Sequence, residues 1–157
     1  MPELEADHAM GIYATANTGN IIVSPDKDMR QIPGRVYNLD ETIHVTPEEG
    51  ARWHLIQTLA GDQTDGYSGV PGIGVKRAVA LFESDGYSWE TVVKAFANKD
   101  LDEDAALMNA RLARILTCID YDITNKQVIP WTPPPGYRAD GGAGVQDETA
   151  NGSTTEG

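Results

Sequence analysis

Cysteine is almost absent from this chain of 157 residues, in which Cys118 stands alone, so no disulfide can form within it. A sequence without a disulfide framework is typical of a reducing compartment. Long apolar runs are also missing, because no stretch approaches the roughly 20 residues that a membrane-spanning helix needs, and the N-terminus lacks the basic-then-apolar order of a signal peptide. These absences favour a cytoplasmic protein that has no membrane partner.

Basic residues are scarce as well, since 12 lysines and arginines face 24 aspartates and glutamates and the formal net charge is −12. This balance argues against a nonspecific basic coat for nucleic acid. Residues 1–65 carry a net −7, residues 66–99 carry +1, and residues 100–137 and 138–157 carry −3 each. Arg111 and Arg114, in the third segment, are expected to be surface charges and not DNA contacts. A dense carboxylate group is costly unless a cation neutralises it, so the acidic first segment predicts a bound cation.

The apolar pattern predicts one domain's worth of α/β structure that is mostly helical. Thr46-Pro47-Glu48-Glu49 is a capping box that starts a helix, and Ser88 and Asp102 are expected to cap two more. The tail over residues 136–157 is acidic and poor in apolar residues, and we expect it to be disordered. The remaining expected elements are a helix over 2–18, a buried parallel strand at 21–23, an irregular strand or hairpin over 31–45, a helix over 75–83 and an extended segment over 120–131.

Six acidic residues fall into three short groups, which are Glu5 with Asp7, Asp26 with Asp28, and Asp62 with Asp65. Asp62 and Asp65 are three residues apart, so on a helical turn both project from one face, a spacing that suits hard cations. Asp26 and Asp28 follow the strand at 21–23, at the end where open α/β sheets bind ligands. Displacement of a phosphodiester oxygen uses two divalent ions about 3.5–4 Å apart, and these need many carboxylates. The alternative is that the acids are solvated caps of helices and strands.

A glycine-rich turn follows the last acidic pair, in which Gly69, Gly72 and Gly74 lead to Lys76 and Arg77 at the start of a helix. The turn completes neither a P-loop nor a dinucleotide fingerprint, because valine and arginine stand where a lysine and a third glycine belong. We interpret it as a hairpin whose amides and following helix N-terminus bind a DNA phosphate, with the two basic side chains adding charge. A plain glycine-rich turn between helices is the alternative.

Taken together, these residues resemble the 5′-nuclease family, the flap endonucleases and 5′–3′ exonucleases of phages and of bacterial DNA polymerase I, and within it the phage T7-type 5′–3′ exonuclease. The likeness covers residues 2–135. For the fold, it implies part of the parallel sheet of a PIN-like nuclease domain in residues 1–60 and a helix–three-turn–helix DNA-binding region in residues 61–135. The matching segments are Glu3-Leu4-Glu5-Ala6-Asp7, Ser24-Pro25-Asp26-Lys27-Asp28, Gly61-Asp62-Gln63-Thr64-Asp65-Gly66-Tyr67-Ser68-Gly69, the Gly-Val-Pro-Gly-Ile-Gly hairpin and residues 110–116.

The resemblance also implies a reaction, which is the metal-dependent hydrolysis of a DNA phosphodiester at or near a 5′ end, in DNA replication in a bacterial or phage-infected cytoplasm. The substrate is duplex DNA with a 5′ end or a flap. The family's ligands for two Mg²⁺ or Mn²⁺ ions correspond to Glu5, Asp7, Asp26, Asp28, Asp62 and Asp65, of which the last four are expected to be catalytic. The DNA-binding hairpin, whose carbonyls can also hold K⁺, corresponds to Gly69, Val70, Gly72, Ile73, Gly74, Lys76 and Arg77.

This chain departs from the family pattern in two places. The family has Glu-Ala-Asp-Asp where this chain has Glu5-Ala6-Asp7-His8, and an imidazole can bind Mn²⁺ but is a poor partner for Mg²⁺. The family's first strand, its N-terminal aspartates and the arch that threads the 5′ end have no counterpart here. We therefore expect a C-terminal portion that is active only with a separate N-terminal nuclease half. Two further hypotheses are a non-catalytic, structure-specific DNA-binding module and a cation-binding protein unrelated to DNA.

Overall fold

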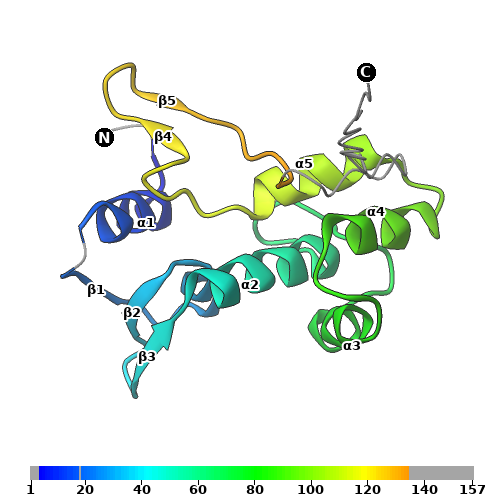
Figure 1. Cartoon of the computed structure of the whole chain (residues 1–157), viewed down its shortest axis with the longest axis horizontal. Helices are drawn as coiled ribbons and strands as arrows, with labels where there is room; N and C mark the ends of the chain where they lie inside the picture. Colours follow the sequence, from blue (N-terminus) through cyan, green and yellow to red (C-terminus); the bar gives the residue numbers. More distant parts are fainter. Residues whose placement is uncertain (1–3, 18, 135–157) are drawn as a thin grey trace, which may run out of the picture.

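The computed structural model describes residues 4–17 and 19–134, and their arrangement is shown in Figure 1. The expected class is confirmed, because the described chain is mixed α/β and mostly helical. The tail that was expected to be disordered, residues 136–157, lies outside the described residues. In chain order the elements are α1 (Ala6–Ala16), β1 (Ile21–Val23), the 3₁₀ helix η1 (Lys27–Gln31), β2 (Gly34–Tyr37), β3 (Thr42–Val45), α2 (Pro47–Ala60), α3 (Val75–Asp85), α4 (Trp89–Ala97), α5 (Glu103–Ala113), β4 (Tyr121–Asp122) and β5 (Gln127–Val128).

A three-stranded sheet in the order β1-β2-β3 occupies one end of the molecule. The predicted parallel pairing is present between β1 and β2, whereas β2 and β3 form an antiparallel hairpin. The prediction that the whole run 21–23 is buried is wrong. Only Ile22 faces the core, and Ile21 and Val23 are 46% and 59% exposed. The reason is that successive side chains of a strand point to opposite faces of the sheet, and only one face of β1 is covered.

Helix α2 connects the sheet to the helical half of the molecule, as Figure 1 shows. Its start was predicted correctly, because the Thr46 hydroxyl accepts from the Glu49 amide at 3.1 Å and the Glu49 carboxylate accepts from the Thr46 amide at 2.8 Å. One core cluster joins α2 to α3, α4 and α5, and a smaller one lies beneath the sheet and η1. The end of α2 therefore lies where the two halves of the fold meet.

Helices α3, α4 and α5 pack around a core that includes Phe82, Trp89 and Phe96, each at most 1% exposed. The predicted caps of the last two helices are confirmed. The Ser88 hydroxyl accepts from the Thr91 amide at 3.2 Å, and the Asp102 carboxylate accepts from the Ala105 amide at 2.9 Å. None of the helices that the structure describes combines the length and the apolar composition that a bilayer crossing requires.

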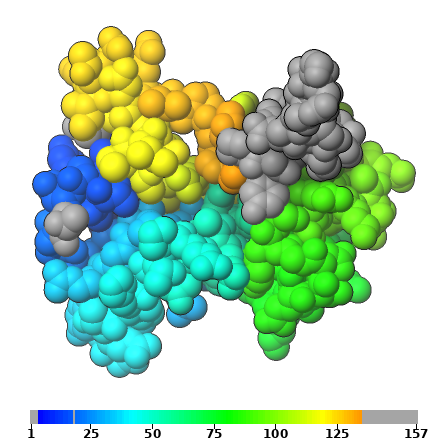
Figure 2. Space-filling model, in the orientation of Figure 1, coloured from blue at the N-terminus to red at the C-terminus, as the bar shows by residue number. Residues whose placement is uncertain are grey.

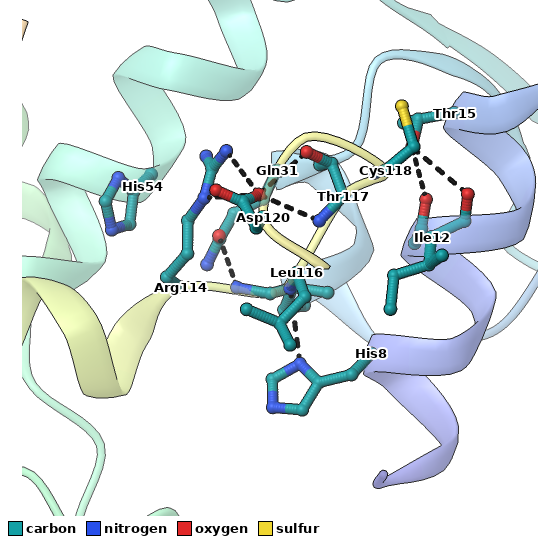
Figure 3. A network of polar contacts seen from close by, with 12 residues as sticks. His8, Ile12, Thr15, Gln31, His54, Arg114, Leu116, Thr117, Cys118 and Asp120 are labelled. Atoms are coloured by element: carbon teal, nitrogen blue, oxygen red, sulfur yellow. Dashed lines mark hydrogen bonds and ion pairs between the residues drawn. The ribbon is translucent and has the colours of Figure 1, made fainter. Parts of the chain in front are cut away.

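After α5 the chain returns to the sheet end of the molecule and forms the short β4–β5 hairpin, which Figure 2 shows protruding in yellow. Arg114 begins this return, and its guanidinium pairs with the Asp120 carboxylate at 2.8 Å, with both side chains largely buried. The expectation that Arg114 is a surface charge is therefore wrong. The same carboxylate accepts from the amide and the hydroxyl of Thr117, which closes the loop shown in Figure 3.

Candidate metal centre and nucleic-acid interface

Three of the predicted metal ligands lie together at the junction of the two halves of the fold. Asp28 is in the first turn of η1, and Asp62 and Asp65 belong to the loop that leaves α2. Each offers a carboxylate oxygen, and these oxygens all lie within 4.8 Å of one another. We call Asp28, Asp62 and Asp65 the acid cluster. Oxygen donors at this density are the ligand set that Mg²⁺ and Mn²⁺ take in proteins.

The loop from Asp62 to Tyr67 brings two of these carboxylates together by a tight reversal of the chain. Asp62 and Tyr67 exchange backbone hydrogen bonds at 2.9 and 3.1 Å, and Gly66 takes a φ of +81° between them. The Asp62 carboxylate accepts from the amide of Thr64 at 2.9 Å and from its hydroxyl. Asp62 and Asp65 therefore lie on a closed loop and not on a helical turn, and this loop places both acids in the cluster.

Three other predicted acids, Glu5, Asp7 and Asp26, lie around the acid cluster and outside its closest group. Glu5 precedes α1, Asp7 is in the first turn of α1, and Asp26 caps η1 by accepting from the Asp28 amide at 2.9 Å. Burial raises the pKa of both Asp7 and Asp65, and the charges of the nearby Glu5 and Asp26 raise it further. All six acids thus share one electrostatic environment.

The electrostatics of the cluster are unfavourable for a chain with no bound cation. Partial burial, together with the negative charge of Asp26, raises the pKa of Asp28 from 3.8 to about 6. Burial and neighbouring carboxylates also raise the pKa of Asp7 and Asp65. Asp62 is the exception, because its hydrogen bonds with Thr64 lower its pKa. A divalent cation would remove this mutual repulsion.

Replacing Asp28 with asparagine is expected to stabilise the metal-free chain at neutral pH. Because the pKa of Asp28 is raised on folding, the folded state holds the proton more tightly than the unfolded state, so stability falls as pH rises between about 4 and 6. The substitution removes this loss and should add ~1 kcal/mol at pH 8, after allowance for solvent screening of a partly exposed group. Urea unfolding in EDTA at pH 4 and pH 8 measures it. A variant less stable than the unsubstituted chain at pH 8 contradicts it.

His8 cannot take the place of the carboxylate that it replaces while it makes its present contact. Its Nδ1 accepts a hydrogen bond from the Leu116 amide at 3.2 Å, as Figure 3 shows. A neutral imidazole that accepts at Nδ1 carries its proton on Nε2, so neither nitrogen is free to bind a metal. The suggestion that His8 binds Mn²⁺ is therefore wrong for this conformation. His8 instead ties α1 to the loop after α5.

The glycine-rich turn crosses the end of α2 so closely that two glycines are required. A Cβ on Gly69 would lie 2.4 Å from the Leu59 carbonyl oxygen, and one on Gly61 would lie 2.4 Å from the Ser68 backbone. Both residues also have positive φ, +60° and +69° respectively. The Gly69 amide donates to the Asn109 side chain of α5 at 2.9 Å. The start of the turn is thus fixed by α2 on one side and by α5 on the other.

The other predicted phosphate-binding residues come directly after Gly69 in the chain, and they differ in how far they are exposed to solvent. Val70 is 1% exposed and belongs to the core, so only its backbone is available to a ligand. Gly72 and Gly74 are exposed, and Ile73 is half-buried. Lys76 and Arg77 are exposed on the first turn of α3, whose N-cap, Gly74, makes no side-chain hydrogen bond. Amides, a helix N-terminus and two cations therefore lie next to one another at the surface.

Sequence reasoning missed four polar residues that hold these groups in place, namely Gln31, Gln57, Tyr67 and Asn109. Gln57 donates to the Asp28 carboxylate at 2.5 Å, and Gln31 donates to the side-chain oxygen of Gln57. Tyr67 is buried, and the negative charge of Asp28, Asp62 and Asp65 adds to burial in raising its pKa. The one available signal was Gln57, a polar side chain between Ile56 and Leu59 in the last turns of α2.

Two phage exonucleases are similar in sequence to this chain. The exodeoxyribonuclease of Enterobacteria phage T3 is 29% identical over an alignment of 173 positions that takes in 84% of the chain and 56% of the phage protein. For the exonuclease of Escherichia phage T7 the identity is 27%, over 84% of the chain and 57% of the phage protein. The chain is homologous to these phage exonucleases. It spans little more than half the length of each relative, and no family model matches it.

Proposed function

We propose that this chain carries the divalent-cation site and the DNA-binding turn of a 5′–3′ exonuclease or flap endonuclease, an enzyme that hydrolyses DNA phosphodiesters at or near 5′ ends. The observation that carries the proposal is the convergence of Asp28, Asp62 and Asp65 from two separate segments to within 4.8 Å. Homology to phage exonucleases supports the reaction class. The adjacent turn, with its exposed amides and cations, supports DNA as the substrate.

The residues of the acid cluster have distinct roles in this proposal. Asp28, Asp62 and Asp65 hold Mg²⁺ or Mn²⁺, and the surrounding Glu5, Asp7 and Asp26 complete the negative field. The chemistry that two such ions supply when bound is an activated water and stabilisation of the leaving oxygen. Asp62 stays ionised over the widest pH range, because its hydrogen bonds with Thr64 lower its pKa. Asp28 requires a higher pH or a bound cation before it ionises fully.

The glycine-rich turn holds the duplex on the far side of the cleavage position. Phosphate oxygens accept from the amides around Gly72 and Gly74 and from the N-terminus of α3, while Lys76 and Arg77 supply charge. Arg77 donates to the Gly72 carbonyl at 3.0 Å, which keeps the guanidinium beside the turn. The carbonyls of the same turn are the proposed K⁺ ligands.

The division of labour that we propose places residues 1–60 in a PIN-like nuclease domain and residues 61–135 in a helix–three-turn–helix region. The sheet and η1 share one core cluster and the helices α3, α4 and α5 share another, to which Ile56 and Leu59 at the end of α2 also belong. Full activity is proposed for this chain together with an N-terminal nuclease half. The exposed apolar side chains of Ile21 and Val23 on the edge strand β1 support the addition of further sheet structure there.

The experiment that tests this function follows the release of nucleotides from 5′-labelled duplex, nicked and flapped DNA. The chain is mixed with the N-terminal half of the phage T7 exonuclease, and the reaction is run with Mg²⁺, with Mn²⁺ and with EDTA. Release from the 5′ end that depends on both the chain and the divalent ion supports the proposal. A chain that binds the same DNA equally well in EDTA, and never accelerates release, is instead the non-catalytic DNA-binding module.

Replacing both Lys76 and Arg77 with alanine is expected to weaken duplex binding about tenfold and to flatten its salt dependence. Each cation that neutralises a phosphate contributes about one to the slope of log K against log salt, so the slope should fall by about two. Fluorescence anisotropy at several KCl concentrations measures both quantities. Arg52→Ala is the control, because Arg52 lies near the start of α2 and pairs with Glu48. An unchanged slope in the double variant contradicts a phosphate contact at this turn.

A further inference from the structure

A continuous set of hydrogen bonds runs from the acid cluster into the interior of the protein. The Asp28 carboxylate accepts from the side-chain amide of Gln57 at 2.5 Å, and the Gln57 oxygen accepts from the amide of Gln31. Gln31 in turn donates to the Ala113 carbonyl at 2.6 Å and accepts from the Ile115 amide at 3.0 Å. Gln57 and Gln31 are only 6% and 2% exposed. Two buried glutamines thus connect Asp28 to the end of α5.

The backbone at the end of α5 fixes which way both side-chain amides point. Ala113 presents a carbonyl and Ile115 presents an N–H, so Gln31 must direct its NH₂ group to the first and its oxygen to the second. The Gln31 NH₂ group is a donor, so the Gln57 group that it meets on α2 must be the side-chain oxygen. With its oxygen committed, Gln57 always offers an N–H to Asp28. A reversed amide would leave unpaired buried groups, which cost about 1–3 kcal/mol each.

We propose that Gln57 and Gln31 are positioning residues that hold the Asp28 carboxylate in place for a divalent cation. The proposal rests on the function proposed above, because it assigns these residues to the cation site of the acid cluster. The Gln57 N–H satisfies one oxygen of Asp28 and holds the carboxylate toward Asp62 and Asp65 against their repulsion. A hydrogen-bonded partner behind a metal ligand typically contributes 10–100-fold to metal affinity.

The connection also reaches a part of the chain that is itself rigidly held. Ala113 and Ile115 flank Arg114, whose ion pair with Asp120 fixes the loop after α5, and Figure 3 shows Gln31 beneath this loop. The position of Asp28 is therefore set by the end of α5, more than 80 residues away in sequence, as well as by its own turn. Binding of a cation that moves the Asp28 carboxylate should therefore change the environment of the Ile115 amide.

Mn²⁺ binding measured by electron paramagnetic resonance tests the assignment with substituted chains. Gln57→Met and Gln31→Met preserve length and remove the amide, and we expect the first to weaken Mn²⁺ binding about tenfold or more and the second to weaken it less. In an Asp28→Asn background, Gln57→Met should have no further effect. Gln127→Met, at an exposed glutamine of β5 in the β4–β5 hairpin, is the matched control and should bind like the unsubstituted chain.

Mg²⁺ titration of the unsubstituted ¹⁵N-labelled chain tests the same assignment, and this measurement does not depend on whether a substituted chain folds. The side-chain amide signals of Gln57 and Gln31 and the backbone signal of Ile115 should shift together with Mg²⁺ occupancy. If Asp28→Asn abolishes binding while Gln57→Met leaves it unchanged and these signals stay still, the positioning role is wrong and the cation site stands. If the unsubstituted chain binds neither ion, the cation site is wrong and the positioning role with it.

Discussion

Replacing Asp62 with alanine is expected to reduce nucleotide release from 5′-labelled duplex DNA by about 10³-fold, measured with the N-terminal half of the phage T7 exonuclease present and Mg²⁺ saturating. Asp62 contributes one of three carboxylates that lie within 4.8 Å, and its hydrogen bonds with Thr64 keep it ionised. Cations held at such a site supply several kcal/mol of charge stabilisation in the transition state, and each 1.4 kcal/mol is a factor of ten in rate.

The matched control for this substitution is Asp40→Ala, which removes an exposed carboxylate from the β2–β3 turn. We expect the control to retain the rate of the unsubstituted chain. Duplex binding in EDTA, measured on the same samples, should be similar or slightly tighter for Asp62→Ala, because the substitution removes a negative charge from the surface that we propose to face DNA. Equal nucleotide release by Asp62→Ala and the unsubstituted chain contradicts a catalytic role for the acid cluster.

Replacing Gly69 with alanine is expected to destabilise the chain by about 4 kcal/mol and to abolish tight duplex binding. The added Cβ would lie 2.4 Å from the Leu59 carbonyl oxygen and 2.5 Å from the Gly61 nitrogen, and the φ of +60° is itself strained for alanine. Overpacking and a left-handed backbone each cost about 1–3 kcal/mol. Relief of the clash requires movement of the turn away from α2, which breaks the bond between the Gly69 amide and Asn109.

Gly74→Ala is the control for this effect, because it lies in the same turn but has open space around its Cβ position and a φ of −96°. Urea unfolding and duplex binding by anisotropy measure both consequences. The control should lose less than about 1 kcal/mol, since it adds only a methyl group at the surface. If Gly69→Ala and Gly74→Ala are equally stable, the close crossing of the turn over α2 is not a constraint on this fold.

The parts of the fold that could be predicted from the sequence are those determined by neighbours in the chain. The capping box at Thr46 and the caps at Ser88 and Asp102 were predicted because each needs only a side chain and an amide three residues ahead. The burial of the run 21–23 could not be predicted, because it depends on whether both faces of the sheet are covered by other elements. The exposure of Arg114 was predicted wrongly for a similar reason. Its side chain is buried in an ion pair with Asp120, which forms only because the chain loops back after α5.

The same distinction between local and long-range contacts applies to the candidate site. The six acids and the glycine-rich turn were found from their spacing and family likeness, and their roles remain predictions. That Asp28 meets Asp62 and Asp65 follows from the packing of η1 against α2, which the sequence does not reveal. The contacts of Gln31 with Gln57 and with the end of α5 span 26 and more than 80 residues, and a single sequence carries no signal for such pairs.

Calorimetric titration of the chain with Mn²⁺, in the absence of DNA and of any other protein, tests most directly whether the acid cluster is a cation site. The unsubstituted chain should bind Mn²⁺, and a chain with both Asp62→Asn and Asp65→Asn should bind it at least 100-fold more weakly, because two of three clustered carboxylates lose their charge. The Asp40→Asn chain should bind like the unsubstituted one. Equal Mn²⁺ affinity in the unsubstituted chain and in the Asp62→Asn, Asp65→Asn chain contradicts the account.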